Sequence, residues 1–456
     1  METRRLLSVY TVTNTSGDST VAGSLPWAVL QTDYQSPGLD YIVFNIAGPG
    51  PFVIDVNATQ YLTEQVVLDA TTQPGYNGTP LITVRGAGNV PSVFLFASQS
   101  SGSVIRGFAI SNFTANAITV FPGSDGNYIM NNWLGFYKDA SNKVHLNSDL
   151  YYDTAGVGLQ SNYTSIIGNT ISGVYNGVIL LNGDKPDGSG DVYKGNAIQY
   201  NFIGTDPTGA TAASYGNQHS GVFFGAGAQG NYVGPGNVIS GNAVIGVEML
   251  SPTTAGNVVF GNLIGTNFGG TYAIPNGVGV LLASGSQGNV IGGPWGGNVI
   301  SGNPRAGVAL GNPDYPKATG NYVQSNIIGL NAAQTAVIPG QDSGIGMQAG
   351  VTWTNVQYNV IAGSTSNGIV LANSTSNYMA NNFIGKSGYG VAFPNGAFGV
   401  AFLAGANYNW LVGNQYSTSS YGRTYVDKGA IGNYIPDLVA AAAANQAGKR
   451  STASKS

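Results

Sequence analysis

The chain has 456 residues, a formal net charge of −4, 8% charged residues and no cysteine. The absence of cysteine excludes disulfides and thiolate metal sites, and the low charge leaves no basic stripe for nucleic acid or an anionic membrane surface. With 69 glycines and 43% hydrophobic residues, the composition excludes a helical bundle and is too apolar for a disordered chain. We expect strands and turns, with no nucleic-acid partner and no membrane insertion.

Residues 1–88 are predicted to form a cap and the first coils. Ser24 stands at a helix start, because Trp27, Leu30 and Tyr34 follow it at helical spacing. Strands are expected in five β-rich runs bounded by Gly, Pro and Asn turns, at 9–15, 41–46, 51–56, 65–70 and 80–86. Arg4 and Arg5 precede an apolar stretch too short for a secretory signal, so none is expected here.

A repeated unit organises residues 89–434. Each copy opens with Gly-Val or Gly-Ile, alternates for a few residues, and returns after roughly 20 to 50 residues, the period typical of solenoids. The apolar residues at every second position are expected to stack from coil to coil as the core. The predicted columns include Val157/Leu159, Val178/Leu180, Val222/Phe224, Val247/Met249, Val278/Val280, Val308/Leu310, Ile345/Met347, Ile369/Leu371 and Val400/Phe402.

Asparagines recur at the corners of this unit. Two columns lie five residues apart: Asn127, Asn196, Asn257, Asn321 and Asn377 in one, and Asn132, Asn201, Asn262, Asn326 and Asn382 in the other. Asparagine tolerates left-handed backbone, and its amide can bond the same amide one coil away. We expect structural ladders at the turns rather than ligand-binding groups.

Several segments resemble exported bacterial right-handed parallel β-helix proteins with pectate-lyase-like coils: TVTNTSGD, GSLPWAVLQ, DYIVFNI, LDATTQPGYNGTPLI and repeated IGTDPTG-type motifs. The opening residues Glu2 to Ser8 also resemble the leader that often precedes this fold. The resemblance implies an all-β right-handed parallel β-helix solenoid with a short N-terminal cap helix. A short C-terminal helix and a basic tail are expected at 435–456. Proteins of this kind include lyases, hydrolases, epimerases, adhesins and fibre components, so the resemblance indicates fold more than function.

The expected outer face of the repeats carries little chemistry. In the outward position of each Gly-Val strand the residues are small or apolar, and Glu248 is the one charged residue among them. An enzymatic sheet face would be more polar. The 26 tyrosines and five tryptophans are attributed mainly to packing, with a sugar-stacking platform as the alternative.

Acidic residues gather instead in two loops. Asp149 and Asp153 lie in one, and Asp184, Asp187 and Asp191 lie in the other. If the protein is an enzyme, these five are the candidate catalytic residues. Their spacing departs from the calcium-loop pattern, so no cofactor is expected, with calcium as the alternative.

The sequence therefore favours a secreted, non-enzymatic β-helix that acts as a structural or adhesive component of the cell surface and self-associates head to tail into fibres. The alternative is a polysaccharide lyase or hydrolase, or a carbohydrate-binding β-helix, with a surface polysaccharide as partner. Open ends of a stacked sheet invite pairing with another chain. The residues expected at those ends are Val9, Tyr10, Val12, Tyr425, Val426 and Ile435.

Overall fold

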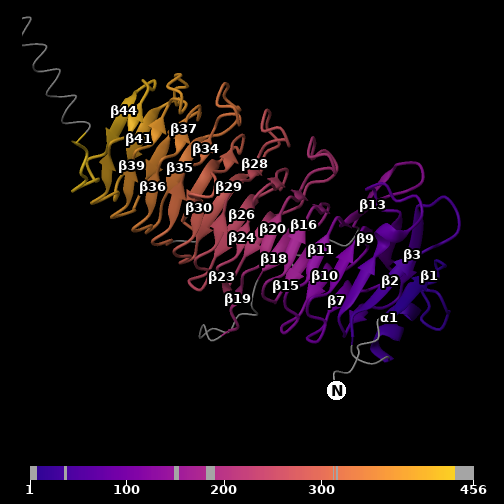
Figure 1. Ribbon diagram of the computed structural model, residues 1–456. Helices are drawn as coiled ribbons and strands as arrows, with labels where there is room; N and C mark the ends of the chain where they lie inside the picture. The colour runs from indigo at the N-terminus through magenta and orange to yellow at the C-terminus, as the bar shows by residue number, and fades with distance from the viewer. Residues whose placement is uncertain are drawn as a thin grey trace, which may run out of the picture. The chain divides into compact units, whose positions relative to one another are not determined.

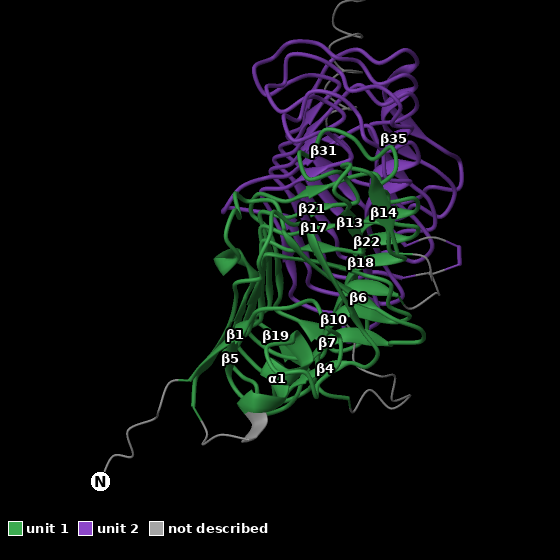
Figure 2. Ribbon diagram, turned by 90° about the vertical axis from the view of Figure 1, so that its right-hand side faces the viewer, with its two compact units in different colours: residues 1–248 green, residues 249–456 purple. Residues whose placement is uncertain are grey.

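The computed structural model describes residues 8–34, 38–147, 154–180, 190–311, 313–314 and 317–436. The chain separates into two compact units, residues 1–248 and 249–456, which Figure 2 shows in different colours. Within each unit the chain winds through three parallel sheets, one strand of each sheet per coil (Figure 1). We name these sheets A1, B1 and C1 in the first unit and A2, B2 and C2 in the second.

The first unit contains most of the irregular structure. Sheet A1 consists of β1 Val9–Val12, β2 Asp40–Phe44, β5 Val66–Asp69, β8 Val104–Arg106, β11 Tyr128–Met130, β16 Ser165–Ile167, β20 Ala197–Gln199 and β24 Tyr232–Val233. Sheet B1 consists of β3 Phe52–Val56, β6 Ile82–Gly86, β9 Phe108–Ser111, β12 Trp133–Leu134, β13 Phe136–Lys138, β14 Val144–Leu146, β17 Thr170–Ile171, β21 Phe202–Ile203 and β25 Val238–Ile239. Sheet C1 consists of β4 Gln60–Leu62, β7 Ser92–Phe96, β10 Asn116–Val120, β15 Ala155–Leu159, β18 Asn176–Leu180 and β22 Ser220–Phe224.

Three further elements complete this part of the chain. A short 3-10 helix, η1 Ala70–Thr72, follows β5, and two short strands, β19 Tyr193–Lys194 and β23 Ala228–Gln229, pair with each other. Strand β26 Ile245–Leu250 follows β22 in sheet order, and its residue Glu248 is the last of the first unit.

The second unit is more regular. Sheet A2 consists of β27 Val258–Val259, β30 Val290–Gly292, β33 Tyr322–Gln324, β36 Asn355–Gln357, β39 Tyr378–Ala380 and β42 Trp410–Val412. Sheet B2 consists of β28 Leu263–Ile264, β31 Val299–Ile300, β34 Ile327–Ile328, β37 Val360–Ile361, β40 Phe383–Ile384 and β43 Gln415–Tyr416. Sheet C2 consists of β29 Val278–Ala283, β32 Ala306–Leu310, β35 Ser343–Met347, β38 Ile369–Leu371, β41 Phe398–Phe402 and β44 Gly422–Val426.

The predicted apolar columns form the core. Val157 pairs with Val178, which pairs with Val222, and all three are fully buried. One column was phased wrongly, because Val280 and Leu282, not Val278 and Val280, align with the next strand at Val308 and Leu310. The sequence Gly-Val-Gly-Val at 277–280 offers two equivalent starts. A Cβ on Gly279 would lie 2.6 Å from Ile300, so Gly279 faces the interior and not the outside.

The N-terminal region matches its prediction closely. Helix α1 spans Leu25–Tyr34, and the Ser24 hydroxyl accepts a hydrogen bond from the Trp27 backbone N–H at 3.1 Å, which is an N-cap. Leu25, Ala28 and Val29 form the buried side of the helix. The five predicted strand runs become β1, β2, β3, β5 and β6, with ends that differ from the prediction by at most three residues. Beyond Pro436, the predicted C-terminal helix and basic tail lie outside the described residues.

The corner asparagines form the predicted ladders. In the second unit the Asn298 side-chain amide donates to the Asn326 oxygen at 2.9 Å, and the Asn326 amide donates to the Asn359 oxygen at 3.0 Å. Each amide also donates to a backbone carbonyl, as Asn326 does to Ile291 at 2.8 Å. Because every side chain in the run both donates and accepts, the buried polar groups at the corner are satisfied without water.

We expect Asn326→Ala to lower the free energy of unfolding by about 3 kcal/mol, because the buried Asn298 backbone N–H and side-chain amide both lose the Asn326 oxygen that accepts from them. The control is Asn331→Ala, which removes the Asn331 hydrogen bonds to Thr335 and Ala336 in an exposed loop of the same unit. Its cost should stay within about 1 kcal/mol. Urea denaturation measures both, and equal costs would contradict the ladder argument.

Candidate functional site

A groove of about 540 Å³ lies on the outer face of sheet C1. Its floor is a row of residues in register, in which Tyr61 pairs with Leu95, Leu95 with Thr119, Thr119 with Gly158, and Gly158 with Ile179. Phe121 and Gln160 line the same groove from the ends of β10 and β15. The groove therefore combines apolar surface with a few polar groups, the usual composition of a ligand site.

A second row on the same face carries hydrogen-bonding side chains. The Asn116 amide donates to the Thr119 hydroxyl at 2.9 Å, and the Thr119 and Ser92 hydroxyls lie 2.7 Å apart. Further along the sheet, the Asn176 side-chain oxygen accepts from the Ser220 backbone N–H at 3.1 Å. This row leads from the groove to strand β22.

At that strand the row ends in a chain of three polar groups. The Ser220 hydroxyl donates to the Glu248 carboxylate at 2.5 Å, and His219 Nδ1 lies 2.9 Å from the same hydroxyl oxygen. Glu248 and Ser220 are buried, whereas about a third of the His219 side chain is exposed. His219 is thus the member of the chain that a ligand on the surface can reach.

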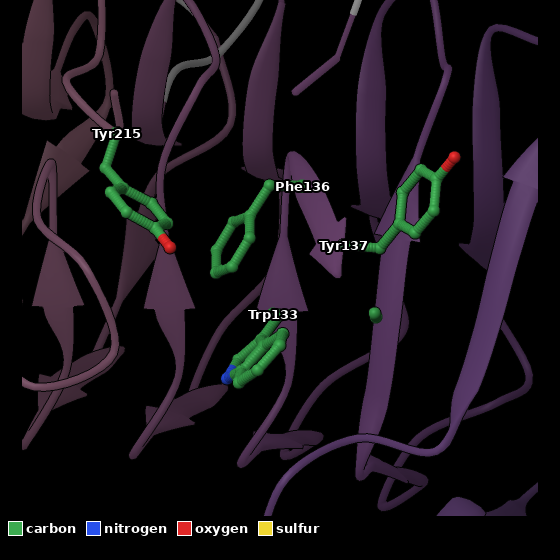
Figure 3. Close-up of a cluster of buried hydrophobic side chains, with 5 residues drawn as sticks. Trp133, Phe136, Tyr137 and Tyr215 are labelled. Atoms are coloured by element: carbon green, nitrogen blue, oxygen red, sulfur yellow. The ribbon is translucent and has the colours of Figure 1, made fainter. Parts of the chain in front are cut away.

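The long loop before β22 fixes the position of His219. Tyr215 in this loop packs edge-on against Phe136, which stacks on Trp133 with ring centroids 5.2 Å apart, and Figure 3 shows the three side chains pointing toward one another. Four residues on, the His219 backbone N–H donates to the Tyr175 carbonyl at 2.8 Å, and the two rings stack at 5.1 Å. Backbone and ring are both held, so the imidazole is preorganised.

The hydrogen bonds set the histidine tautomer. Ser220 has one hydroxyl proton, and while that proton points to an ionised Glu248, the Ser220 oxygen accepts from His219 Nδ1–H. The neutral imidazole then carries its lone pair on Nε2, which makes this atom a base. When Glu248 is protonated the chain can reverse, and Nε2 becomes a donor. The arrangement is a proton relay with an accessible end at His219.

Burial raises the pKa of the Glu248 carboxyl, because the buried environment penalises its ionised form. The hydrogen bond from Ser220 and the nearby His219 charge act in the opposite direction. A carboxyl whose pKa is raised in this way is a frequent feature of acid–base sites.

Among the five acidic candidates from the sequence, Asp149, Asp153, Asp184 and Asp187 lie outside the described residues. Asp191 lies in the segment before β19 and is exposed. Within the described residues no cluster of three or more His, Asp or Glu side chains could hold a metal ion. Calcium in the acidic loops stays a prediction.

The residues expected at the open ends are split between surface and core. Val9, Tyr425 and Val426 are exposed, whereas Val12 and Ile435 are buried. Tyr10 is half-buried and packs edge-on against Trp27. Head-to-tail association through these residues is not tested by the structure.

Sequence reasoning found one member of the relay and missed two. Glu248 stands out in the sequence as the charged residue of the outer face, but the sequence pattern assigns it no partner. Ser220 and His219 lie one coil earlier, directly before the Gly-Val start of β22. An alignment of the repeats that also includes the two residues before each Gly-Val pair would have placed His219 and Ser220 beside Glu248 of the next coil.

Similar solved structures confirm the fold, although no family model and no curated protein sequence matches this chain. The Dettilon tailspike protein gp208 matches with 14% identity and a TM-score of 0.55, over 92% of this chain and 68% of that one. The A-module of Azotobacter vinelandii mannuronan C-5 epimerase AlgE4 matches with 13% identity and a TM-score of 0.46, over 92% and 97%. With the parallel sheets, the tailspike match shows that the chain is a right-handed parallel β-helix.

A third match is DFA-IIIase from Arthrobacter chlorophenolicus A6, with 14% identity and a TM-score of 0.42, over 89% of this chain and 93% of that one. The expectation of a non-enzymatic, fibre-forming surface component is contradicted by these comparisons, because enzymes predominate among the similar structures. In the described part of the chain no helix is long and apolar enough to span a membrane.

We expect the stability of the protein to fall as pH rises through the range set by Glu248. Its pKa in the folded protein lies above the value of about 4.3 in an unfolded chain. The folded state therefore binds this proton more tightly, and the free energy of unfolding decreases between the unfolded and the folded pKa. Glu248→Gln should reduce that decrease, as measured by denaturation midpoints from pH 4 to pH 8, and Asp40, whose pKa burial also raises, supplies part of the remainder.

The control for this experiment is Asp139→Asn. The hydrogen bond from His145 lowers the pKa of the Asp139 carboxyl, so its contribution is lost only as pH falls through the lowered folded pKa. This variant should keep the wild-type decrease above pH 4. A Glu248→Gln protein with an unchanged pH profile would show that Glu248 does not hold the proton.

Proposed function

We propose that the protein is a polysaccharide-cleaving enzyme that acts by β-elimination on the outer face of sheet C1. The observation that carries the proposal is the relay of His219, Ser220 and Glu248 on the same sheet face as the groove. A glycan lying across the strands would fill the groove and reach the exposed edge of His219.

The groove supports binding of sugar rings. Leu95, Phe121 and Ile179 supply apolar surface for the faces of the rings, and Gln160 and Ser92 supply hydrogen-bonding groups for hydroxyls or a carboxylate. Successive strands of a parallel sheet are about 4.8 Å apart, a distance close to the repeat of an extended sugar chain. One strand of C1 can therefore serve one sugar.

The relay suits an elimination better than a hydrolysis by two carboxylates. His219 Nε2 would take the proton from the carbon next to the carboxylate of a uronic acid. The electrons of the C–H bond form a carbon–carbon double bond, and the glycosidic oxygen leaves with the electrons of its own bond and gains a proton from the imidazolium or water. Ser220 is fully buried, so it positions His219 and is not itself a nucleophile. Within the described part of this face Glu248 is the one carboxylate.

Such an enzyme would work outside the cell, where polymeric glycans are found. The names of similar structures, which include a tailspike, a periplasmic epimerase and a surface adhesin, support this location. The glycan would be both substrate and partner of the protein.

The test is release of unsaturated oligosaccharides from alginate, polygalacturonate and hyaluronan, followed by absorbance and mass. We expect activity on at least one of them and a loss of about 100-fold or more in His219→Ala. Glu248→Gln should lower the rate and also change its pH profile, because Glu248 acts through His219. Alanine at Asp184, Asp187 and Asp191 should leave the rate unchanged.

The matched control is His145→Ala. His145 also stacks on a tyrosine, at 4.7 Å from Tyr137, and also bonds a carboxylate, Asp139 at 2.8 Å, but it belongs to the β13–β14 hairpin. This variant should keep full activity. Products without a double bond would indicate hydrolysis instead, and wild-type activity in His219→Ala would refute the site.

A further inference from the structure

The second unit carries an aromatic surface that the proposed reaction does not use. In sheet A2 one outward row aligns Tyr322 with Asn355, Asn355 with Tyr378, and Tyr378 with Trp410. Trp353 stands at the corner before β36, and with Thr354, Asn355, Ser376, Tyr378 and Trp410 it lines a groove of about 300 Å³. Four consecutive coils thus each present an aromatic side chain. In the coil of Asn355 this side chain is Trp353, and in the other coils it is Tyr322, Tyr378 or Trp410.

Trp353 occupies a backbone position that a large side chain rarely takes. Its φ is +56°, in the left-handed region. The equivalent corners of the three preceding coils hold Gly256, Gly288 and Gly320 at φ between +61° and +65°, and those of the two following coils hold Ser376 and Tyr408 at +59° and +55°. A residue other than glycine is strained there. The Trp353 side chain is 63% exposed, so packing does not explain it.

The polar groups of this face are amides and hydroxyls without charge. Gln324 and Gln357 form a second row beside the aromatic one, two residues further along their strands. None of the residues in strands β27, β30, β33, β36, β39 and β42 is charged. An ionised ligand would lose water here without gaining a counter-charge, which is costly.

We propose that this face of sheet A2 is a binding site for an uncharged glycan, separate from the site of cleavage. The flat faces of Trp353, Tyr378 and Trp410 stack on sugar rings, and Gln357 and Asn355 bond their hydroxyls. Strands about 4.8 Å apart place one aromatic or amide group under each successive sugar. The site stands independently of the proposed reaction and would hold the protein on a neutral polysaccharide.

The experiment is affinity electrophoresis of the full chain in gels that contain hydroxyethyl cellulose, galactomannan or amylopectin, with alginate as the charged comparison. We expect at least one neutral polymer to retard the protein and alginate not to retard it through this site. Trp353→Gly and Trp410→Ala should each weaken the retardation about tenfold or more, as buried aromatic anchors do at other interfaces.

Two features keep the result interpretable. Trp353→Gly introduces the residue that the three preceding coils hold at this corner, so its thermal midpoint should equal or exceed that of the wild type. Trp295→Ala is the matched control, because Trp295 is 66% exposed in the same unit but does not line the groove. It should bind like the wild type.

The binding test and the cleavage test can fail independently. His219→Ala should lose cleavage and keep retardation by the neutral polymer, whereas Trp353→Gly should keep cleavage and lose retardation. No retardation by any neutral polymer, retardation that survives in Trp353→Gly and Trp410→Ala, or an equal loss in Trp295→Ala would each overturn the proposal.

Discussion

The asparagine ladder is the interaction on which the rest of the fold depends. At each corner the chain must turn from one sheet into the next within a few residues. The asparagine side chains at the corner are buried, so their amide groups need partners within the protein. Asn298, Asn326 and Asn359 solve this problem together, since each side chain bonds the next and also a backbone carbonyl. Because an unpaired member would cost more than one hydrogen bond, the ladder holds successive coils in a single register.

Register, in turn, determines what each outer face can do. A slip by one residue would exchange the core column with the outward row and would separate Ser220 from Glu248. Because the register is fixed, equivalent positions of successive coils form rows on each outer face. Most positions in these rows hold small or uncharged residues, and a few hold residues of a different kind. The relay on C1 and the aromatic row on A2 are both exceptions of this kind.

The sequence predicted the fold well, because its signals are local and repeated. Alternation with period two identified the core columns of most coils, and Ser24 marked the start of α1 correctly. The phase failed at Gly279, where two Gly-Val pairs in succession are equivalent by pattern. The two possible starts are distinguished only by tertiary contacts, namely the close approach of Gly279 to Ile300 and the pairing with the next coil.

The candidate site was harder to predict, because its members come from different coils. Glu248 and Ser220 are 28 residues apart, and loops of unequal length lie between the repeats. Composition therefore pointed to the acidic loops, where charge is dense in sequence. Charge density in the sequence does not reveal a buried carboxylate, because a solvated carboxylate costs little free energy, whereas a buried one must be balanced by partners.

Departures from the repeat were the better signal. Glu248 replaces small or apolar residues of the outer row, and burial makes its ionised form costly. Trp353 takes a left-handed corner at which the three preceding coils hold glycine, and its backbone is strained there. Each departure lowers the free energy of unfolding relative to the residue that other coils hold at the same position. Because stability alone would favour the residues of other coils at these positions, the two departures are the places at which we propose a function.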